Sequence, residues 1–301
     1  MKSRRLRSPL RYIGGKSFMV NKLLQFVPPH HIYVEVFGGG ASLLIAKKPS
    51  PVEVYNDIDS GAVNFFRVLR DPQKAESFYR LVSLTPVSRE EFRFCRDTWK
   101  QCEDEIERAY RWFVMVRQSF GGKLGRGDWC ITITESSRGM AHSVSAWWSA
   151  IELLPEISKR FLCVVIENRD FRDIICLYDT EETFMYLDPP YMPTTRKNKQ
   201  DYDFEMTTDD HKELVNLILS SKSMFMLSGY DNDIYCELES AGWEKHCFKT
   251  VCRSIGRTKN SKFCGKGGIK EHRGGIECVW LSPNLIENLN GGQLCLTLDK
   301  T

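Results

Sequence analysis

The 301-residue sequence has no Cys-x-x-Cys pair, although it contains 11 cysteines. These are scattered, and no apolar segment of signal-peptide or membrane length follows the basic start of the chain. We therefore expect reduced thiols in a cytoplasmic protein that has no membrane association. The nearest grouping of metal-binding residue types matches no zinc spacing, so no metal site is predicted. This grouping is Cys247, Cys252, Cys264 and His272.

Acidic residues are absent before Glu35, whereas basic residues recur throughout that segment, including Arg11, Lys16 and Lys22. The net charge of +3 does not by itself imply a nucleic-acid partner. A second basic run, rich in Gly, Ser and Asn, cannot pack a core but can follow a phosphate backbone. A solvated surface loop is the alternative interpretation of this run. It includes Arg253, Arg257 and Lys259.

The first part of the chain alternates between strand and helix signals. Residues 32–37 indicate a strand, residues 38–40 a glycine turn, residues 41–47 a helix and residues 52–55 a second strand. Such a βαβ opening favours a parallel sheet. The composition, with 42% hydrophobic and 27% charged residues, is that of an ordinary globular protein.

Residues 60–159 differ in character, being mostly helical in pattern and strongly charged. Within them, a glycine-rich basic segment at residues 121–129 precedes alternating Ile and Thr, which favours a projecting hairpin or loop. Strand signals then resume. They lie at residues 163–166, 184–187, 224–227 and 277–281, with a helix at about 208–221. We therefore predict one sheet domain, 1–59 with 160–301, interrupted by an inserted domain, 60–159.

The most specific short motif is Asp188-Pro189-Pro190-Tyr191, which directly follows an apolar strand. At the carboxyl end of a parallel strand it would lie where open α/β sheets bind ligands. The prolines stiffen the turn and leave the Pro189 carbonyl available to a ligand. A carboxylate, a carbonyl and an aromatic face suit a planar base with an exocyclic amine. Taken alone, the motif is equally compatible with a rigid turn and a capping Asp.

The glycine turn at residues 38–40 lets the backbone approach a ligand closely, and Asp57 ends the next strand, where a carboxylate typically receives ribose hydroxyls. Leu43 occupies the third glycine position of the dinucleotide fingerprint, which disfavours a dehydrogenase. Gly15-Lys16-Ser17 resembles the end of a phosphate-binding loop. Leu10 stands where that loop needs its first glycine, so an NTPase is disfavoured too.

In combination, five elements resemble the DNA adenine N6-methyltransferases of the Dam type, the D12 class. They occur in the family's order, with cofactor motifs first, then a target-recognition insert, then D-P-P-Y. The elements are Arg11-Tyr-Ile-Gly-Gly-Lys16, Val34-Glu-Val-Phe-Gly-Gly-Gly-Ala-Ser42, Asn56-Asp-Ile-Asp59, Asn168-Arg-Asp-Phe-Arg-Asp173 and Asp188-Pro-Pro-Tyr191. The resemblance implies a Rossmann-like methyltransferase sheet, mostly parallel with about seven strands, and a mainly helical target-recognition insert carrying a β-hairpin.

The resemblance also implies a role for each matching residue. Asp188, Pro189 and Tyr191 would be catalytic, the first two as acceptors for the target amine and Tyr191 as a stacking face for a flipped-out adenine. S-adenosylmethionine would be the cofactor. Its binding residues would be Tyr12 and Lys16 of the first segment, Glu35, Phe37, Gly38 and Gly40 at its methionine part, Asp57 at its ribose, Asp170 and Phe171 at its adenine, and Asp188.

Sequence recognition is expected in the insert, where Arg117, Lys123, Arg126 and Arg138 are of types that contact bases or phosphates. Gln118 belongs to the same group. The insert does not match the Dam insert that recognises GATC, so no target sequence is predicted. Arg253, Arg257 and Lys259 would hold DNA from the second basic run.

The sequence thus predicts a monomeric, site-specific adenine methyltransferase that acts on double-stranded DNA. Three alternatives remain open. One is methylation of another planar nitrogen, in cytosine, RNA or protein glutamine, although glutamine enzymes usually carry Asn at the position of Asp188. Another is an inactive DNA-binding regulator on the same fold, and the third is a dehydrogenase.

Overall fold

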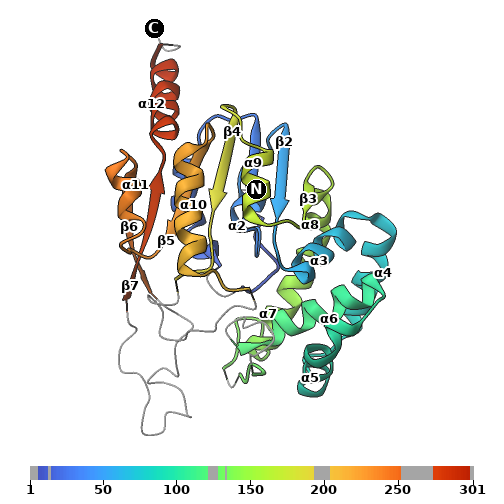
Figure 1. Cartoon of the computed structure of the whole chain (residues 1–301). Helices are drawn as coiled ribbons and strands as arrows, with labels where there is room; N and C mark the ends of the chain where they lie inside the picture. The colour runs from blue at the N-terminus through green and yellow to red at the C-terminus, as the bar shows by residue number, and fades with distance from the viewer. Residues whose placement is uncertain are drawn as a thin grey trace, which may run out of the picture.

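The computed structural model describes residues 6–12, 15–120, 128–132, 134–192, 204–251 and 274–298. Within them, seven strands form one sheet in the order β3-β2-β1-β4-β5-β7-β6 (Figure 1). The strands are β1 (Ile32–Glu35), β2 (Val52–Asn56), β3 (Val165–Glu167), β4 (Thr183–Leu187), β5 (Met224–Gly229), β6 (Glu244–Val251) and β7 (Gly274–Leu281). Strands β1 to β5 are parallel, and β7 is antiparallel to both β5 and β6. The predicted mostly parallel sheet is confirmed.

The order of the strands reverses at β1. The chain first moves outward from β1 through β2 to β3, and it later returns to the other side of β1 as β4 and β5. In open parallel sheets such a reversal leaves a crevice outside the carboxyl ends of the two central strands. Glu35 ends β1 and Asp188 directly follows β4, so both residues lie at this crevice.

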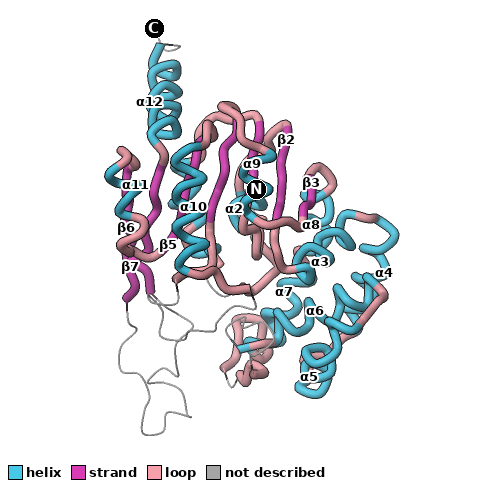
Figure 2. The backbone as a smooth tube through the Cα atoms, viewed as in Figure 1, coloured by secondary structure: helices cyan, strands magenta, loops and turns pink. Residues whose placement is uncertain are grey.

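Helices cover both faces of the sheet, as Figure 2 shows. Successive side chains of a strand alternate between faces, so Tyr33 and Tyr186 enter one apolar cluster whereas Val34 and Met185 enter another. Burial on both faces explains why these strands are near-continuous apolar runs. The surrounding helices are α1 (Val20–Leu23), α2 (Ser42–Ala46), α9 (Phe171–Leu177), α10 (Thr208–Ser220), α11 (Cys236–Ser240) and α12 (Pro283–Leu298), with 3-10 helices η1 (Lys16–Phe18) and η2 (Leu24–Phe26).

The chain between β2 and β3 is helical, as predicted, and α4, α5 and α6 gather at the lower right of Figure 1. Asp59, Asp71 and Asp104 accept backbone N–H groups at the starts of α3, α4 and α6, which satisfies donors that the helices cannot pair themselves. The elements are α3 (Ser60–Arg70), α4 (Pro72–Leu84), α5 (Arg89–Thr98), η3 (Trp99–Gln101), α6 (Glu105–Gln118), α7 (His142–Ile151) and α8 (Leu154–Phe161).

Two helices of this region share the core of the sheet. Phe66 of α3 stacks on Phe161 of α8, with ring centres 4.1 Å apart. The ring centre of Tyr55 of β2 lies 4.8 Å from that of Phe66. The predicted boundary between residues 159 and 160 therefore falls inside α8, a helix that packs with the sheet. The division into 1–59 with 160–301 and 60–159 stays a prediction.

Two isolated antiparallel bridges lie where the hairpin of the insert was expected. One joins Ser119 to Trp129 and the other joins Glu135 to Ala141. The described residues of 60–159 form no strand. Residues 121–127, which carry the glycines of the predicted turn, lie outside the described part of the chain.

One pair of cysteines differs from the expectation of reduced thiols, whereas six other described cysteines are free. Cys247 of β6 and Cys278 of β7 are direct partners in the antiparallel register and form a disulfide, with Cα atoms 4.2 Å apart. Strand pairing brought together two cysteines that lie 31 residues apart in sequence, which spacing rules do not anticipate. In the described residues no helix is long and apolar enough to span a bilayer.

Candidate functional site

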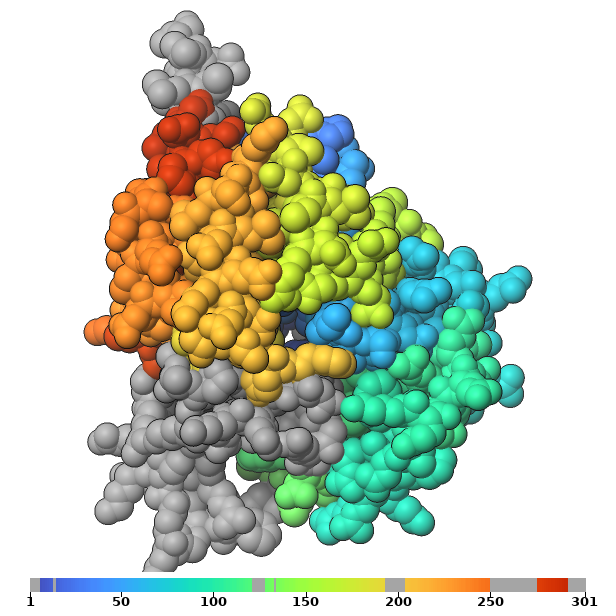
Figure 3. Space-filling model, in the orientation of Figure 1, coloured from blue at the N-terminus to red at the C-terminus, as the bar shows by residue number. Residues whose placement is uncertain are grey.

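A cavity lies at the carboxyl edge of the sheet, at the reversal of strand order. In Figure 3 the surface is hollowed where light-blue residues near 55 meet gold residues near 205. The lining includes most of the residues predicted for the cofactor and the catalytic turn, namely Tyr12, Lys16, Glu35, Phe37, Gly38, Gly40, Asp57, Asp188 and Pro189. Segments from three separate parts of the sequence thus share one cavity.

The glycine turn is clamped by its neighbours. A Cβ atom at Gly38 would lie 2.2 Å from the ring of Tyr55, and Gly39 has a φ of +46°, so both positions favour glycine. The Tyr55 hydroxyl donates to the Gly39 carbonyl over 2.9 Å, and the Gly39 N–H donates to Asp57 Oδ2 over 2.5 Å. Backbone atoms therefore form this wall of the cavity, with no side chain in the way.

Asp57 and Asp59 form a second wall. Asp57 accepts the N–H groups of Gly39 and Asp59, and burial, followed by the charge of Asp59, raises the pKa of Asp57 to about 7. Asp59 also accepts the Tyr12 hydroxyl over 2.9 Å, which ties the N-terminal segment to the end of β2. This contact connects two of the predicted cofactor-binding segments directly.

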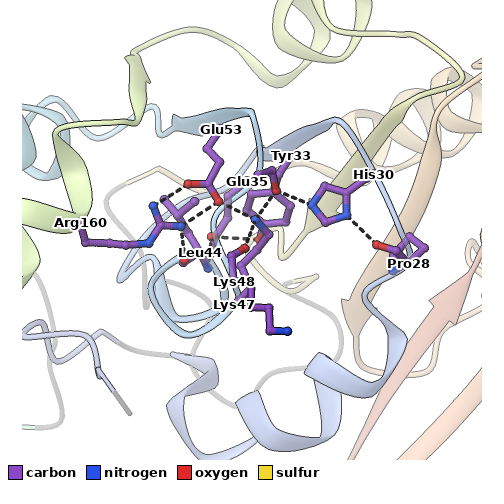
Figure 4. Close-up of polar contacts among 10 residues, drawn as sticks. Pro28, His30, Tyr33, Glu35, Leu44, Lys47, Lys48, Glu53 and Arg160 are labelled. Carbon is purple, nitrogen blue, oxygen red and sulfur yellow. Dashed lines mark hydrogen bonds and ion pairs between the residues drawn. The ribbon is translucent and has the colours of Figure 1, made fainter. Parts of the chain in front are cut away.

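Glu35 is buried at the end of β1, and Figure 4 shows its polar neighbours. Its Oε2 accepts the Leu44 N–H over 2.9 Å and the Tyr33 hydroxyl over 3.1 Å. Burial raises the pKa of Glu35 to about 8, and these two donors only partly oppose the rise. The carboxyl group lines the cavity and has no ion-pair partner among the described residues.

Asp188 of the D-P-P-Y motif is held by a cation from the N-terminal segment. Lys16 Nζ lies 2.5 Å from Asp188 Oδ1. Burial raises the pKa of Asp188 to about 6, although the ammonium group of Lys16 acts in the opposite direction. A carboxyl group with this pKa is ionised at pH 7.5 and can accept hydrogen bonds. Pro189 lines the same cavity.

Tyr191 is not among the lining residues of this cavity. It is buried beside it, its hydroxyl donates to Glu277, and Lys16 Nζ lies 4.8 Å from the centre of its ring. Tyr230 packs against the same ring, with centres 4.5 Å apart. The aromatic member of the motif therefore belongs to the charged cluster around Asp188.

The sequence of the chain matches one family model over residues 12–248, that of the D12 class N6 adenine-specific DNA methyltransferases. The chain belongs to this family. The resemblance drawn from the five ordered motifs is thereby confirmed, and all five lie within or at the edge of the matched region.

A curated relative of this D12 chain is the modification methylase StsI of Streptococcus sanguinis. The two are 23% identical over 205 residues, which is 63% of this chain and 29% of the relative. The D12 chain thus spans less than a third of the length of the relative that it matches.

Two residues predicted to meet the cofactor's adenine contact other side chains in this member of the D12 class. Asp170 caps α9 by accepting the Arg172 N–H over 2.9 Å and also pairs with the Arg172 guanidinium group. The ring centre of Phe171 lies 5.7 Å from that of Phe37, and Phe37 itself lines the cavity. Neither Asp170 nor Phe171 is part of the lining, and their predicted contacts with a cofactor stay predictions.

Three of the residues predicted to contact DNA lie in the described part of the chain, and the other five lie outside it. The guanidinium group of Arg117 donates to the Ala146 carbonyl over 2.6 Å, which joins α6 to α7, and burial lowers its pKa to about 10. Arg138 is exposed and pairs with Glu152 at 2.8 Å. Gln118 is buried and bonds to the backbone near residues 86–88. Lys123, Arg126, Arg253, Arg257 and Lys259 lie outside the described residues.

Among the residues of the D12 site that were missed in the sequence are Asp59, Phe204 and Glu277. Asp59 carried a signal, since it shares the Asn56-Asp57-Ile58-Asp59 motif. Phe204 lines the cavity from a segment after the D-P-P-Y motif, and no pattern marks it. Glu277 interrupts an apolar strand, which is a signal for a buried charge, but its partners depend on the strand order.

Proposed function

We propose that this chain transfers a methyl group from S-adenosylmethionine to N6 of adenine in double-stranded DNA. The observation that carries the proposal is the single cavity shared by Asp188, Pro189, the glycine turn and Asp57. Membership in a family of DNA adenine methyltransferases supports both the reaction and the substrate. The monomeric state remains a prediction.

The cavity suits the cofactor in charge and shape. S-adenosylmethionine, when bound, supplies an electrophilic methyl group on a positively charged sulfur. The carboxyl groups of Glu35, Asp57 and Asp188 line the cavity and favour a cationic ligand. Gly38 and Gly40 leave backbone within reach of the ligand, and Asp57 offers oxygens to hydroxyl groups. Tyr12 and Lys16 would close this pocket from the N-terminal side.

The chemistry of the target follows from its electronic structure. An adenine amine is a weak nucleophile because its lone pair is delocalised into the ring. When Asp188 and the Pro189 carbonyl each accept one N–H, the nitrogen becomes more tetrahedral and its lone pair becomes available. With the cofactor bound, formation of the bond between N6 and the methyl carbon would break the carbon–sulfur bond and leave a neutral thioether, while Asp188 would receive a proton from the amine and release it to solvent. Positioning and charge stabilisation supply most of the rate.

The target base must leave the helix to reach this cavity, because its amine lies inside the base stack. In our proposal Tyr191 provides the stacking face for the extruded adenine. The packing of its ring against Tyr230 and its buried hydroxyl hold that ring in one orientation before DNA binds. Such preorganisation lowers the entropic cost of forming the reactive arrangement.

The test is to incubate the purified chain with methyl-labelled S-adenosylmethionine and mixed-sequence duplex DNA, then digest the DNA and identify the labelled nucleoside. Label in N6-methyladenine is expected. Label in cytosine, RNA or protein would assign another nitrogen, and DNA binding without any label would assign an inactive regulator. Either outcome contradicts the proposal.

Asp188→Ala is the matched variant for this assay. It should still bind DNA but lose roughly a hundredfold to a thousandfold in transfer rate, as expected for loss of an acceptor at the reacting group. Asp209→Asn, at an exposed acid on α10, is the control and should keep wild-type activity. Full activity in Asp188→Ala would refute the assigned role.

A further inference from the structure

A buried carboxylate outside the sequence motifs lies beside the D-P-P-Y segment. Glu277 of β7 is only 4% exposed, and its Oε1 accepts the Tyr191 hydroxyl. The same oxygen lies 3.1 Å from Lys16 Nζ, which also lies 2.5 Å from Asp188 Oδ1. One ammonium group therefore stands between two carboxylates, and one of the two also holds the motif's aromatic ring.

The antiparallel direction of β7 places Glu277 there. Ser228, near the end of β5, pairs with Val279, so the residues that precede Val279 in β7 lie at the carboxyl edge of the parallel strands. A charge buried in an apolar strand is costly unless it is paired and hydrogen-bonded. Among the described residues, Lys16 and Tyr191 meet both conditions, and both belong to the site.

We propose that Glu277 is a positioning residue of the transferase. Its carboxylate orients Tyr191, and it holds the ammonium group of Lys16 when Asp188 accepts a hydrogen bond from the target amine. The inference rests on the proposed function. Lys16 occupies one acceptor oxygen of Asp188 in this structure. Glu277 offers the ammonium group a second anion within reach, so Asp188 can exchange Lys16 for the amine without leaving a buried charge unpaired.

The electrostatic surroundings of Asp188 give the proposal a measurable signature. Loss of the Glu277 charge removes a nearby anion that also attracts Lys16, and both changes lower the pKa of Asp188. Its other titratable or hydrogen-bonding neighbours are unaltered by such a substitution. These neighbours are Glu35, Tyr186, Ser228 and Tyr235.

The experiment measures kcat, KM for S-adenosylmethionine and the pH profile of adenine methylation for the wild-type chain, Glu277→Gln and Glu244→Gln. Glu244 is an exposed carboxylate on the neighbouring strand β6 and serves as the control. For Glu277→Gln we expect kcat to fall roughly tenfold, KM to change less than about threefold, and the acidic limb of the profile to move to lower pH.

The contribution that Glu277 makes through Tyr191 is tested separately by a double-mutant cycle. The cycle compares Glu277→Ala, Tyr191→Phe and the double variant. If the carboxylate acts on the ring through the hydroxyl, the double variant loses less activity than the product of the two single losses. Thermal unfolding identifies any variant that fails to fold. In that case Tyr191→Phe, which removes only one oxygen, decides whether the hydroxyl contact matters.

Three results would overturn the inference. Wild-type kcat and pH profile in Glu277→Gln would show that the carboxylate plays no part in the reaction. A lower kcat with an unmoved acidic limb would indicate a merely structural role. Absence of label in adenine with the wild-type chain would instead remove the proposed function itself, and the inference with it.

Discussion

Two carboxylates on adjacent strands, Glu35 of β1 and Glu53 of β2, are both buried but have opposite environments. They point to the same face, since Tyr33 pairs with Glu53 and Glu35 with Tyr55 in the parallel register. Glu53 forms ion pairs with Lys47 and Arg160, each at 2.5 Å. Among the described residues, the donors to Glu35 are one hydroxyl and one backbone N–H (Figure 4).

The difference is visible in the acidity of the two groups. Burial acts to raise the pKa of Glu53, yet Arg160 and Lys47 together lower it below its ordinary value. Burial raises the pKa of Glu35 to about 8, and the charge of Lys47, which forms its ion pair with Glu53, opposes this rise only weakly. The paired carboxylate serves the fold, whereas the unpaired one faces a cavity, where a cationic ligand would complete its environment.

The largest effect is expected from Glu53→Gln, which leaves Lys47 and Arg160 buried without their anion. We expect the free energy of unfolding to fall by about 3–5 kcal/mol, as for other broken buried ion pairs. Urea denaturation measures this loss. A variant with methionine at all three positions should recover most of it, because no orphaned charge remains. A loss below about 1 kcal/mol in Glu53→Gln would contradict the comparison.

A second effect concerns pH. Because the pKa of Glu35 is raised in the folded chain, its contribution to stability is full below about pH 4.5 and is lost as pH rises toward 8. A cation in the cavity favours the ionised form, so affinity for S-adenosylmethionine should rise roughly tenfold between pH 6.5 and 8.5.

Calorimetric titration of the wild-type chain and Glu35→Gln checks this expectation. Asp57 and Asp188, with pKa values of about 7 and 6, act in the same direction, so the difference between the two proteins isolates Glu35. Glu35→Gln should bind more weakly at pH 8.5 and show a flatter profile. Equal slopes for both proteins would mean that Glu35 does not sense the ligand's charge.

The smallest effect is expected from Tyr33→Phe, which removes one hydroxyl that contacts Glu35 and leaves the ion pairs of Glu53 in place. Its hydroxyl donates to Glu35, and Lys47 Nζ lies 4.4 Å from the centre of its ring. Loss of the hydroxyl should raise the pKa of Glu35 further and weaken cofactor binding at pH 7.5 by about 1 kcal/mol, roughly fivefold. Binding curves at several pH values test this. Unfolding should change little, because the ring and the Glu53 ion pairs remain.

The sequence predicted those residues of the site whose positions depend on the strand directly before them in the chain. The glycine turn after β1, Asp57 after β2 and Asp188 after β4 were all placed from the strand that precedes each of them. The carboxyl ends of parallel strands meet at one edge, so these residues converge in a cavity once the sheet is known to be parallel. Family membership followed from the order of the same motifs.

Other features depended on partners that lie far away in sequence. Gln118 and Arg117 looked like nucleic-acid ligands, but Gln118 bonds to the backbone near residues 86–88 and Arg117 bonds to the backbone of α7. In each case a hydrogen bond within the folded chain satisfies a side chain that the sequence alone left available. The disulfide between Cys247 and Cys278 likewise required the register of β6 and β7.

The amino-acid sequence by itself determined the reaction family and the tips of the central strands, because glycine, proline and acidic residues act on the backbone beside them. Only the tertiary structure decided that Glu277 stands next to Lys16 and Tyr191, and that Glu35 lacks the cations that Glu53 has. The reason is that the free energy of a buried charge depends on its neighbours in space, and these neighbours come from strands and helices distant in the chain.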